Sequence, residues 1–365
     1  MRSSYSQNNT YKSCPKYWEW SYKQRLTTNE CSSALYFGSA VDDAIMANLE
    51  GEKNYMDVFE SRWMSARGYG KNKPDTIIFD NPDVTYASSD FDVDILEQED
   101  IDTMQGWVNQ LRLNKLGSDP IKVFDKIKSS MRSKYKNPTA TQIKYYNRCC
   151  WLGLKRKGTV LIDSFITQFK PKIKKVIATQ KPAKLVTPEG DVVYGYLDFV
   201  AEIEGYDKPI IIDLKTAARP YDQSKIDLTD QLTLYYTMAG EEYKTDLVGY
   251  VVLSKKINKT EVGLCTVCGH KKTSTHKTCD NVINGKRCKG AWDIKTTIAP
   301  EVQVLVQQKT QKDKDDLLAD YTAIHKGMKT GVIYRNLDKC TNWYGGLCPY
   351  YDACHKNDTS GLVSK

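Results

Sequence analysis

The stretch from Gly195 to Ala217, GYLDFVAEIEGYDKPIIIDLKTA, places three charged residues within two apolar runs. Asp198 lies in the first run, Asp213 and Lys215 lie in the second, and a turn signal at 205–207 separates the runs. Antiparallel pairing would bring the carboxylates together, and Asp213 and Lys215, two residues apart, would point to one face of their strand. Unpaired buried charges are costly, and Mg²⁺ or Mn²⁺ suits two carboxylates, so we expect a metal site where Lys215 positions or helps to deprotonate an attacking water. A plain salt bridge of Lys215 at a sheet edge is the alternative.

Gln231 and Tyr235 follow in the segment QLTLY, within an expected helix over 227–239. Residues four apart project from one helix face, so this pair can meet the sheet together. There it would hydrogen-bond a nucleic-acid phosphate or the lysine. The alternative interpretation is a surface glutamine beside a core tyrosine.

A family resemblance rests on three motifs in this order: Gly195-Tyr196-Leu197-Asp198, Asp213-Leu214-Lys215 and Gln231-x-x-x-Tyr235. They resemble the motifs of PD-(D/E)XK nucleases of the RecB branch, which includes helicase-associated, CRISPR-adaptation and bacteriophage exonucleases. The resemblance implies an α/β fold of the restriction-endonuclease type, a mixed central sheet flanked by helices, here with a helical insertion and a small zinc-ribbon insertion. It also implies metal binding by Asp198 and Asp213, a role for Lys215 at the nucleophile, and support of the site by Gln231 and Tyr235.

An early helix of this family usually carries Gly-x-x-x-His, and Gly38-Ser39-Ala40-Val41-Asp42 fits that pattern with Asp42 in place of histidine. The four histidines of the chain all lie far along the sequence, at positions 270, 276, 325 and 355. An aspartate also offers oxygen to Mg²⁺ or Mn²⁺, so we expect metal binding with altered affinity or metal preference. The alternative is an ordinary surface acid and a weak enzyme.

Four cysteines follow the pattern C-x2-C-x10-C-x8-C: Cys265, Cys268, Cys279 and Cys288. Each pair can offer two thiolates to one tetrahedral ion, so the spacing predicts a structural Zn²⁺ ribbon, with His270 and His276 as reserve ligands. The ribbon lies between two expected strands, at 247–253 and 301–307, so we expect it to be an insertion in a hairpin. Unligated thiols are the alternative.

A second group, CTNWYGGLCPYYDAC, contains Cys340, Cys348 and Cys354, which leaves a four-ligand site one thiolate short. RecB-branch proteins with an iron–sulfur cluster pair three such cysteines with a lone early one, and Cys14 resembles it. The resemblance implies a 4Fe-4S cluster that joins the two chain ends. The gap between Cys340 and Cys348 is longer than the usual C-x2-C, so zinc and free thiols stay open as alternatives.

Basic charge is concentrated between residues 111 and 185, where nineteen Lys or Arg face three Asp, whereas the whole chain carries only +8. Such a stretch suits a phosphate backbone, although a solvated helical surface is the alternative. The candidate DNA-binding residues are Lys155, Arg156, Lys157, Lys172, Lys174 and Lys175.

The expected organisation has five parts. Residues 1–60 form N-terminal helices of the nuclease core, with Cys14. Residues 61–180 form a basic, mainly helical insertion. The catalytic sheet and the Gln231 helix occupy 181–260, and the zinc ribbon occupies 261–295. The last part, 296–365, holds a strand, a helix and the C-terminal cysteines.

Local patterns place helices at 11–25, 40–49, 103–169 and 313–329, with a loop at Phe37-Gly38-Ser39 and an exposed connection at 88–102. They place strands at 184–187, 192–203 and 208–215. The first residues lack the apolar stretch of a secretory signal, and no apolar run of about 20 residues occurs, so we expect a soluble cytoplasmic protein without a membrane partner.

The sequence thus predicts a metal-dependent nuclease, more specifically an exonuclease on DNA ends or single strands in phage or bacterial recombination, replication or DNA processing. The alternative hypothesis is a DNA-binding or assembly module that keeps the fold but has little catalysis.

Overall fold

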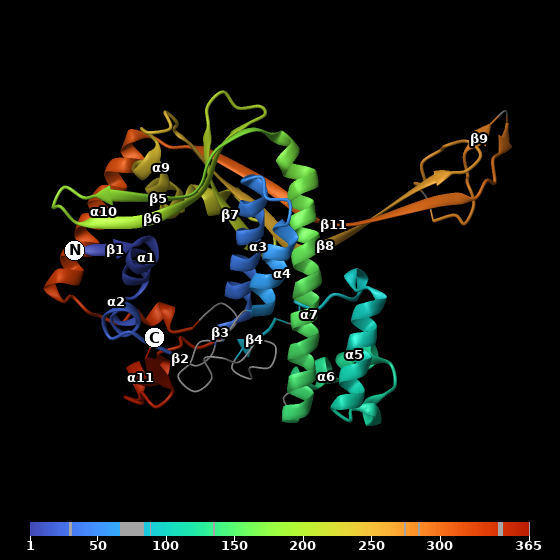
Figure 1. Cartoon of the computed structure of the whole chain (residues 1–365), viewed down its shortest axis with the longest axis horizontal. Coiled ribbons are helices and arrows are strands. Elements are labelled where there is room, and N and C mark those ends of the chain that lie inside the picture. The colour runs from blue at the N-terminus through green and yellow to red at the C-terminus, as the bar shows by residue number, and fades with distance from the viewer. Residues whose placement is uncertain are drawn as a thin grey trace.

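The computed structural model of the chain describes residues 1–28, 31–65, 84–87, 89–133, 136–273, 275–283, 285–341 and 346–364. A six-stranded mixed sheet lies at its centre, with helices on both faces (Figure 1). This architecture confirms the α/β fold expected from the sequence. Within the described residues, none of the helices has the length and apolar character that crossing a membrane requires.

The sheet follows the order β1-β6-β7-β8-β11, and β5 pairs with β6 as well. Its strands are β1 (Arg2–Ser4), β5 (Ile173–Val186), β6 (Val192–Ile203), β7 (Ile210–Ala217), β8 (Leu247–Cys265) and β11 (Trp292–Gln308). The β1–β6 and β7–β8 pairs are parallel and the others are antiparallel. The expected antiparallel pairing of the two motif strands, β6 and β7, is therefore confirmed.

Strand β6 changes partner along one of its edges. Strand β5 pairs with it over its whole length, from Val192 to Ile203, and so occupies one edge. On the other edge, β7 pairs with 199–201 and β1 pairs with 192–194. Residues 195–198 lie between these two partners, so the sheet has an opening beside the motif Gly195 to Asp198.

Helices on one face of the sheet form the largest apolar core, into which Ile210 and Ile212 of β7 point. They are α3 (Ser33–Leu49), α4 (Tyr55–Ser65), α5 (Gln98–Gln110), α6 (Pro120–Met131) and α7 (Ala140–Ser164). On the opposite face, Ile211 packs with α8 (Gln223–Asp227) and α9 (Asp230–Ala239). A third core joins α1 (Tyr5–Ser13) and α10 (Gln311–Thr330) to the start of β6.

The remaining elements are short. They are α2 (Pro15–Trp18), α11 (Tyr351–His355), β2 (Leu26–Thr28), β3 (Cys31–Ser32), β4 (Val84–Thr85), β9 (Val282–Ile283), β10 (Lys286–Arg287), β12 (Leu362–Ser364), π-helical turns at Glu19–Lys23 and Phe165–Phe169, and 3-10 turns at Val93–Ile95, Asn114–Leu116, Lys170–Lys172 and Leu337–Lys339. Strands β12 and β2 pair, which places the C-terminal residues beside Leu26–Thr28.

Two expectations for the first fifty residues were wrong. The helix expected at 11–25 is divided at Cys14, because Pro15 cannot donate a backbone hydrogen bond and holds its neighbour extended, with φ −159°. Phe37-Gly38-Ser39 is not a loop but part of α3, which already begins at Ser33 because Ser32 caps it. Gly38 allows close approach of α3 to β7 there, since a Cβ would lie 3.3 Å from Oγ1 of Thr216.

Later boundaries also differ. The connection expected to be exposed at 88–102 buries Asp90 and Asp100 and contains the start of α5; Ser88 lies outside the described residues. The helix expected at 227–239 is divided between α8 and α9. Strand β5 begins at Ile173, so Lys174 and Lys175 lie on the sheet rather than in a helical insertion.

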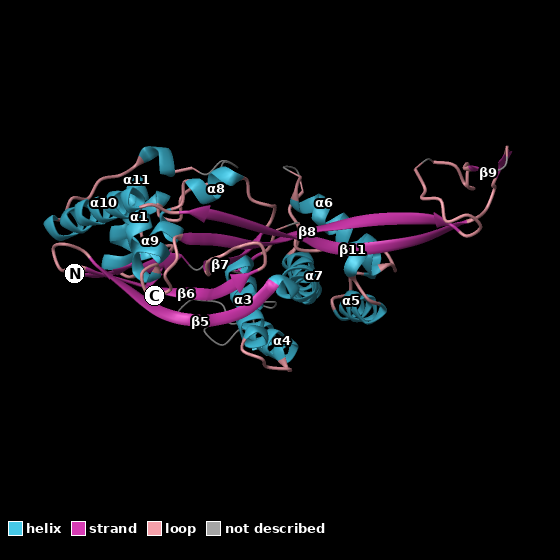
Figure 2. Ribbon diagram, turned by 90° about the horizontal axis from the view of Figure 1, so that it is seen from above, coloured by secondary structure: helices cyan, strands magenta, loops and turns pink. Residues whose placement is uncertain are grey.

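Strands β8 and β11 are much longer than the expected 247–253 and 301–307. Pairing of β8 with β7 ends at Ser254, but its pairing with β11 continues to Cys265 and Trp292. Beyond the sheet, these two strands form a hairpin arm that projects from the body and carries the cysteine ribbon at its tip (Figure 2). The inserted position of the ribbon agrees with the expectation, whereas the length of the arm does not.

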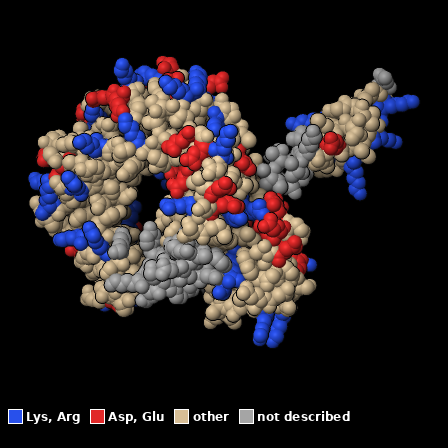
Figure 3. All heavy atoms as spheres, in the orientation of Figure 1, with Lys and Arg blue, Asp and Glu red and all other residues tan. Residues whose placement is uncertain are grey.

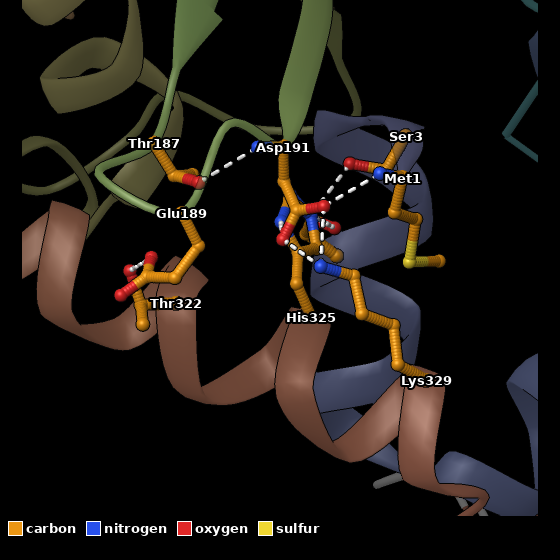
Figure 4. Close-up of polar contacts among 9 residues, drawn as sticks. Met1, Ser3, Thr187, Glu189, Asp191, Thr322, His325 and Lys329 are labelled. Carbon is orange, nitrogen blue, oxygen red and sulfur yellow. Dashed lines mark hydrogen bonds and ion pairs between the residues drawn. The ribbon is translucent and has the colours of Figure 1, made fainter.

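Asp191, at the loop before β6, is the centre of a buried polar cluster (Figure 4). Its carboxylate lies 2.5 Å from the amine of Met1, 2.6 Å from Nζ of Lys329 and 3.6 Å from Nδ1 of His325. Nε2 of His325 in turn lies 2.9 Å from Oγ of Ser3. Burial lowers the pKa of His325, so its ring is neutral at pH 7.

Ser3, His325 and Asp191 have the residue types of a hydrolase triad. However, His325 is 0% exposed and Ser3 5%, so a substrate does not reach the serine. Asp191 also already has two cationic partners. The cluster therefore fastens β1 and α10 to the start of β6.

Asp191→Asn tests this fastening. The amine of Met1 and the ammonium of Lys329 lose their anion, so we expect the free energy of unfolding in urea to fall by about 1–3 kcal/mol. Glu189→Gln is the matched control, since the carboxylate of Glu189 accepts a hydrogen bond from half-buried Thr322 and not from Met1 or Lys329. Equal stability of the two variants would contradict a structural role for the cluster.

Candidate active site

Asp198 stands where the β6–β7 ladder stops. The last paired residues are Phe199 and Ile212. One step further, Oδ2 of Asp198 accepts the backbone N–H of Leu214 at 2.7 Å, in place of a strand carbonyl. This bond fixes the carboxylate at the opening of the sheet, beside Asp213.

Asp213 is buried, at 1% exposure, and has two side-chain partners. Its Oδ2 lies 2.5 Å from Nζ of Lys215, and its Oδ1 accepts from Nε2 of Gln231 at 2.8 Å. Nε2 of Gln231 also lies 3.0 Å from the hydroxyl of Tyr235. Asp213 and Lys215 thus point to one face of β7, as expected. The structure brings them together with Gln231 and Tyr235 of α9.

Asp42 reaches the same cavity from α3, on the other side of the sheet. Its Oδ2 accepts from Nε2 of Gln180 at 3.1 Å, while its buried Oδ1 has no hydrogen-bond donor. Gln180 belongs to β5 and has φ +45°, a left-handed conformation that is uncommon for a residue with a side chain. Sequence reasoning missed Gln180, since no motif marks it.

The pKa values of the three carboxyl groups are raised together. Burial raises the pKa of Asp42 to about 6, despite the bond from Gln180. Burial and the charges of Asp213 and Asp42 raise that of Asp198 to about 8. Burial likewise raises the pKa of Asp213, although Lys215 opposes it. Burial and the repulsion between the carboxylates therefore disfavour ionisation of all three groups beside a single lysine, and a bound cation would favour it.

Lys215 stays cationic in these surroundings. Burial alone would lower its pKa, but Asp213 and Asp198 outweigh burial and raise the pKa to about 12. Its ammonium also lies 5.7 Å from the centre of the Tyr250 ring, whose hydroxyl is 2.9 Å from Oγ1 of Thr229. Tyr250 and Thr229 are further residues around the lysine that carried no signal in the sequence.

The carboxylates open into a cavity of about 620 Å³. Figure 3 shows the molecule hollowed at this place, between the side that carries α1 and the side that carries α3. Tyr5, Tyr194 and Tyr196 line the cavity, and the last two are 42% and 62% exposed. A second cavity of about 570 Å³ adjoins it and shares Tyr5, Lys215 and Gln231.

The donor set fits a hard divalent cation. Three carboxylates surround a single lysine, and two of them, Asp42 and Asp213, have a buried oxygen without a hydrogen-bond donor, that of Asp213 being ion-paired with Lys215. Oxygen ligands are those that Mg²⁺ and Mn²⁺ take. The three carboxylates do not form a group within 4.8 Å, as the ribbon thiolates described below do. Mg²⁺ usually keeps several of its waters, so it does not need every ligand from the protein.

The ribbon cysteines form a compact group. Among the described residues, only Cys265, Cys268, Cys279 and Cys288 bring three or more possible metal ligands within 4.8 Å of one another. Sγ atoms 3.6 Å apart, as in the Cys265–Cys288 and Cys268–Cys279 pairs, are close to the ~3.8 Å edge of a tetrahedral zinc–thiolate site. Gly290 is required, since a Cβ would lie 2.6 Å from Sγ of Cys265.

The second cysteine group lines a separate cavity of about 680 Å³, which includes Cys14, Cys340, Cys348 and Cys354. The early cysteine thus lines the same cavity as the three late ones, although their Sγ atoms do not form a group within 4.8 Å. Two backbone contacts hold this junction: Asn336 donates its N–H to Sγ of Cys14 at 3.4 Å, and Cys348 donates to the carbonyl of Cys340 at 2.8 Å. Four thiolates around a cavity suit a cluster that is larger than one ion.

The six basic candidates divide into two groups. Arg156 is paired with Asp100 at 2.5 Å and with Glu97 at 3.2 Å, and Lys157 is 3% exposed and bonded to the carbonyl of Ser89 at 2.6 Å. Lys155 pairs with Glu60. The expectation of an open phosphate-binding face on this helix is therefore wrong, because acids and carbonyls already occupy these cations. Lys172, Lys174 and Lys175 are exposed at the start of β5.

The mixed sheet and its carboxylate–lysine opening define a class of metal-dependent phosphodiesterase. A family model described as the PD-(D/E)XK nuclease superfamily matches residues 153–355, more than half of the chain. The chain therefore belongs to the PD-(D/E)XK nuclease superfamily, whose members act on nucleic acids with Mg²⁺ or Mn²⁺. The match includes Asp198, Asp213 and Lys215 but neither Asp42 nor Cys14. No curated protein matches the chain.

The raised pKa of Asp198 gives a test of metal binding by stability. Its folded form favours the proton, so stability is lost as pH rises from the ordinary carboxyl range through 8. At pH 8 in EDTA we expect Asp198→Asn to melt higher than the unmodified chain, whereas millimolar Mn²⁺ should raise the melting temperature by a few degrees only in proteins that keep Asp198. Asp207→Asn, in the exposed β6–β7 turn, is the control. Equal Mn²⁺ shifts in all three proteins would exclude Asp198 as a ligand.

Proposed function

We propose that the chain is a metal-dependent DNA exonuclease that acts on ends or single strands, with Asp42, Asp198 and Asp213 as ligands of Mg²⁺ or Mn²⁺. The observation that carries this proposal is the network of Asp198, Asp213, Lys215 and Gln231 at the wall of an open cavity. When bound, the cation stabilises the charge that develops on the phosphate and favours ionisation of water.

The side chains have separate tasks. Asp213 holds Lys215 at 2.5 Å, which leaves the remaining ammonium protons free to orient a water or a phosphate oxygen. Gln231 fixes the other oxygen of Asp213, and Tyr235 fixes the glutamine. Gln231 and Tyr235 are thus positioning residues in this mechanism, whereas Lys215 contacts the reacting groups.

A preference for ends or single strands is supported by the aromatic wall of the cavity. Tyr194 and Tyr196 expose their rings at its margin, and Tyr5 lies inside it. Unpaired bases stack on such rings, whereas paired bases within a duplex do not offer their faces. Bacterial or phage recombination, replication or DNA processing is the proposed setting.

The competing hypothesis, a binding module with little catalysis, rested on Asp42 standing where the family usually has histidine. Asp42 lines the cavity together with Asp198 and Asp213, and its charge contributes to the raised pKa of Asp198. Its oxygen without a donor favours metal binding. This contact supports the enzyme over the module.

Cleavage of labelled single strands in Mg²⁺ and in Mn²⁺ tests the proposal. Lys215→Ala and Asp213→Ala should each reduce the rate by roughly a thousandfold or more, since each removes several kcal/mol of charge stabilisation. Substrate binding by the two variants should change little, and Lys326→Ala, on the exposed face of α10, should cleave normally. Undiminished cleavage by either site variant would sink the assignment. End-blocked and circular substrates distinguish exonuclease from endonuclease action.

We further propose a 4Fe-4S cluster at Cys14, Cys340, Cys348 and Cys354 and a structural Zn²⁺ in the ribbon. Anaerobically purified protein should then contain about four irons and one zinc per chain. Cys348→Ser should lose the iron and the visible absorbance but keep the zinc, and Cys279→Ser should do the reverse. Colourless protein with two zinc ions would reject the cluster, and a zinc content unaffected by Cys279→Ser would reject the ribbon site.

A further inference from the structure

A third cavity, of about 700 Å³, lies at the root of the hairpin arm. It is lined by residues of α6, of α7, of the segment after β7 and of β8. Its charged residues are Lys128, Lys157, Arg219, Lys255, Lys256 and Asp92. Basic residues thus outnumber acidic ones five to one in this lining. Lys157, whose ammonium already has hydrogen-bond partners, is the one basic residue of α7 among them.

The cations of this root cavity differ in availability. Lys157 is buried beneath it and bonded to carbonyls, and Lys255 pairs with Asp90 at 3.3 Å. Arg219 and Lys256 are exposed, so their charges face an arriving ligand. Burial lowers the pKa of Lys157, although the charges of Asp92 and Asp90 oppose this, so the free positive charge of the cavity comes from Arg219 and Lys256. The cavity therefore favours an anionic ligand such as phosphate.

Its position links the proposed active site to the arm. Arg219 follows Lys215 by four residues, which is roughly 13 Å of extended chain. Lys256 follows Ser254, the last residue of β8 that pairs with the catalytic strand β7. A phosphate chain leaving the active site in the direction of β7 meets this cavity next.

The ribbon at the tip continues the same charge. Residues 265–293 contain six Lys or Arg and two Asp, so even with a Zn²⁺ and four thiolates the module keeps a positive surplus. Lys286, Arg287 and Lys289 are exposed on and beside β10. Figure 3 shows lysine and arginine side chains standing out from the projecting module.

The length of the arm fits a duplex. From Val252, level with Lys215, to Cys265 the strand spans thirteen residues, roughly 40 Å. At 3.4 Å per base pair this is about 12 base pairs, a little more than one turn. We infer that the arm holds double-stranded nucleic acid: backbone phosphates contact Arg219 and Lys256 at its root, and phosphates about one turn further on contact Lys286 and Arg287 in the ribbon.

This inference rests on the proposed function for its orientation, since it places the duplex behind a strand that enters the active site. A protein partner of the ribbon is the competing reading, suggested by Val267 and Val282, which are 71% and 64% exposed. Charge complementarity and the continuous path from the active site favour the duplex.

The test measures binding without divalent metal, in a Lys215→Ala background, to labelled duplexes of 10 and 24 base pairs with the same short overhang. Three double variants each remove two charges. They are Lys286→Gln/Arg287→Gln in the ribbon, Arg219→Gln/Lys256→Gln at the root, and Lys312→Gln/Lys326→Gln on α10 as the control. Zinc content is measured in each, so that a ribbon that has lost its fold is recognised.

We expect the ribbon variant to weaken binding of the 24-base-pair duplex about tenfold and to reduce the salt slope by about 2, while leaving the 10-base-pair duplex unaffected. The root variant should weaken both duplexes, and the control neither. Unchanged binding of the long duplex by the zinc-loaded ribbon variant overturns the inference. This is the result that a ribbon that binds only a protein partner would give. An equal loss of affinity for the 10- and 24-base-pair duplexes in the ribbon variant overturns it as well. The ribbon would then not contact phosphates one helical turn beyond the root cavity.

Failure of the proposed function gives a different result. Suppose that the unmodified chain binds the 24-base-pair duplex more tightly than the 10-base-pair duplex but does not cleave in Mg²⁺ or Mn²⁺. The proposed nuclease activity would then be wrong, and duplex binding by the arm would stand. Suppose instead that the unmodified chain cleaves and that the ribbon variant binds and cleaves long duplexes equally well. The nuclease activity would then stand, and duplex binding by the arm would be wrong.

Discussion

The partner change along one edge of β6 is the constraint on which the rest of the site depends. Strand β7 leaves that edge at Phe199 and β1 takes it up again at Tyr194. In the interval, the amide of Leu214 would lack a strand acceptor, and the carboxylate of Asp198 supplies one. The central sheet thus has an opening in which Asp213 and Lys215 form an ion pair. Asp42 of α3 and Gln231 of α9 reach into the same opening. The Asp191 cluster matters for the same reason, because it holds β1 in place at the far side of the opening.

The parts of the site that the sequence predicted are those set by local periodicity. Asp213 and Lys215 share a face because strands alternate, and Gln231 and Tyr235 share a face because helices return after four residues. Gln180 could not be found this way, since it reaches Asp42 only through the long-range pairing of β5 and through a left-handed backbone. Arg156 and Lys157 show the opposite error. Charge density in a sequence does not reveal that Asp100 and the carbonyl of Ser89 fold against those cations.

The arm was underestimated for a related physical reason. Strands of a sheet core are recognised by apolar residues with period two, and β8 has them only as far as Leu253, where α7 and α9 cover it. Beyond Ser254 the strand no longer pairs with β7 and leaves the body with β11 (Figure 2), so it no longer needs the apolar pattern of a core strand and its sequence resembles a polar loop. The ribbon was predictable because its ligands are defined by spacing rather than by burial.

The ribbon also explains how so long a hairpin keeps its register. A two-stranded hairpin is marginally stable alone in water, and beyond Ser254 strand β8 pairs with β11 but no longer with β7. At the base, β7 fixes β8 as far as Ser254; at the tip, Cys265 is both the last paired residue of β8 and a member of the thiolate group. A metal held there closes the open end of the ladder and prevents slippage of the strands between two fixed points. Zinc in the ribbon and duplex binding along the arm are therefore coupled in the proposed enzyme, whereas the chemistry at Lys215, within the sheet, does not depend on the tip.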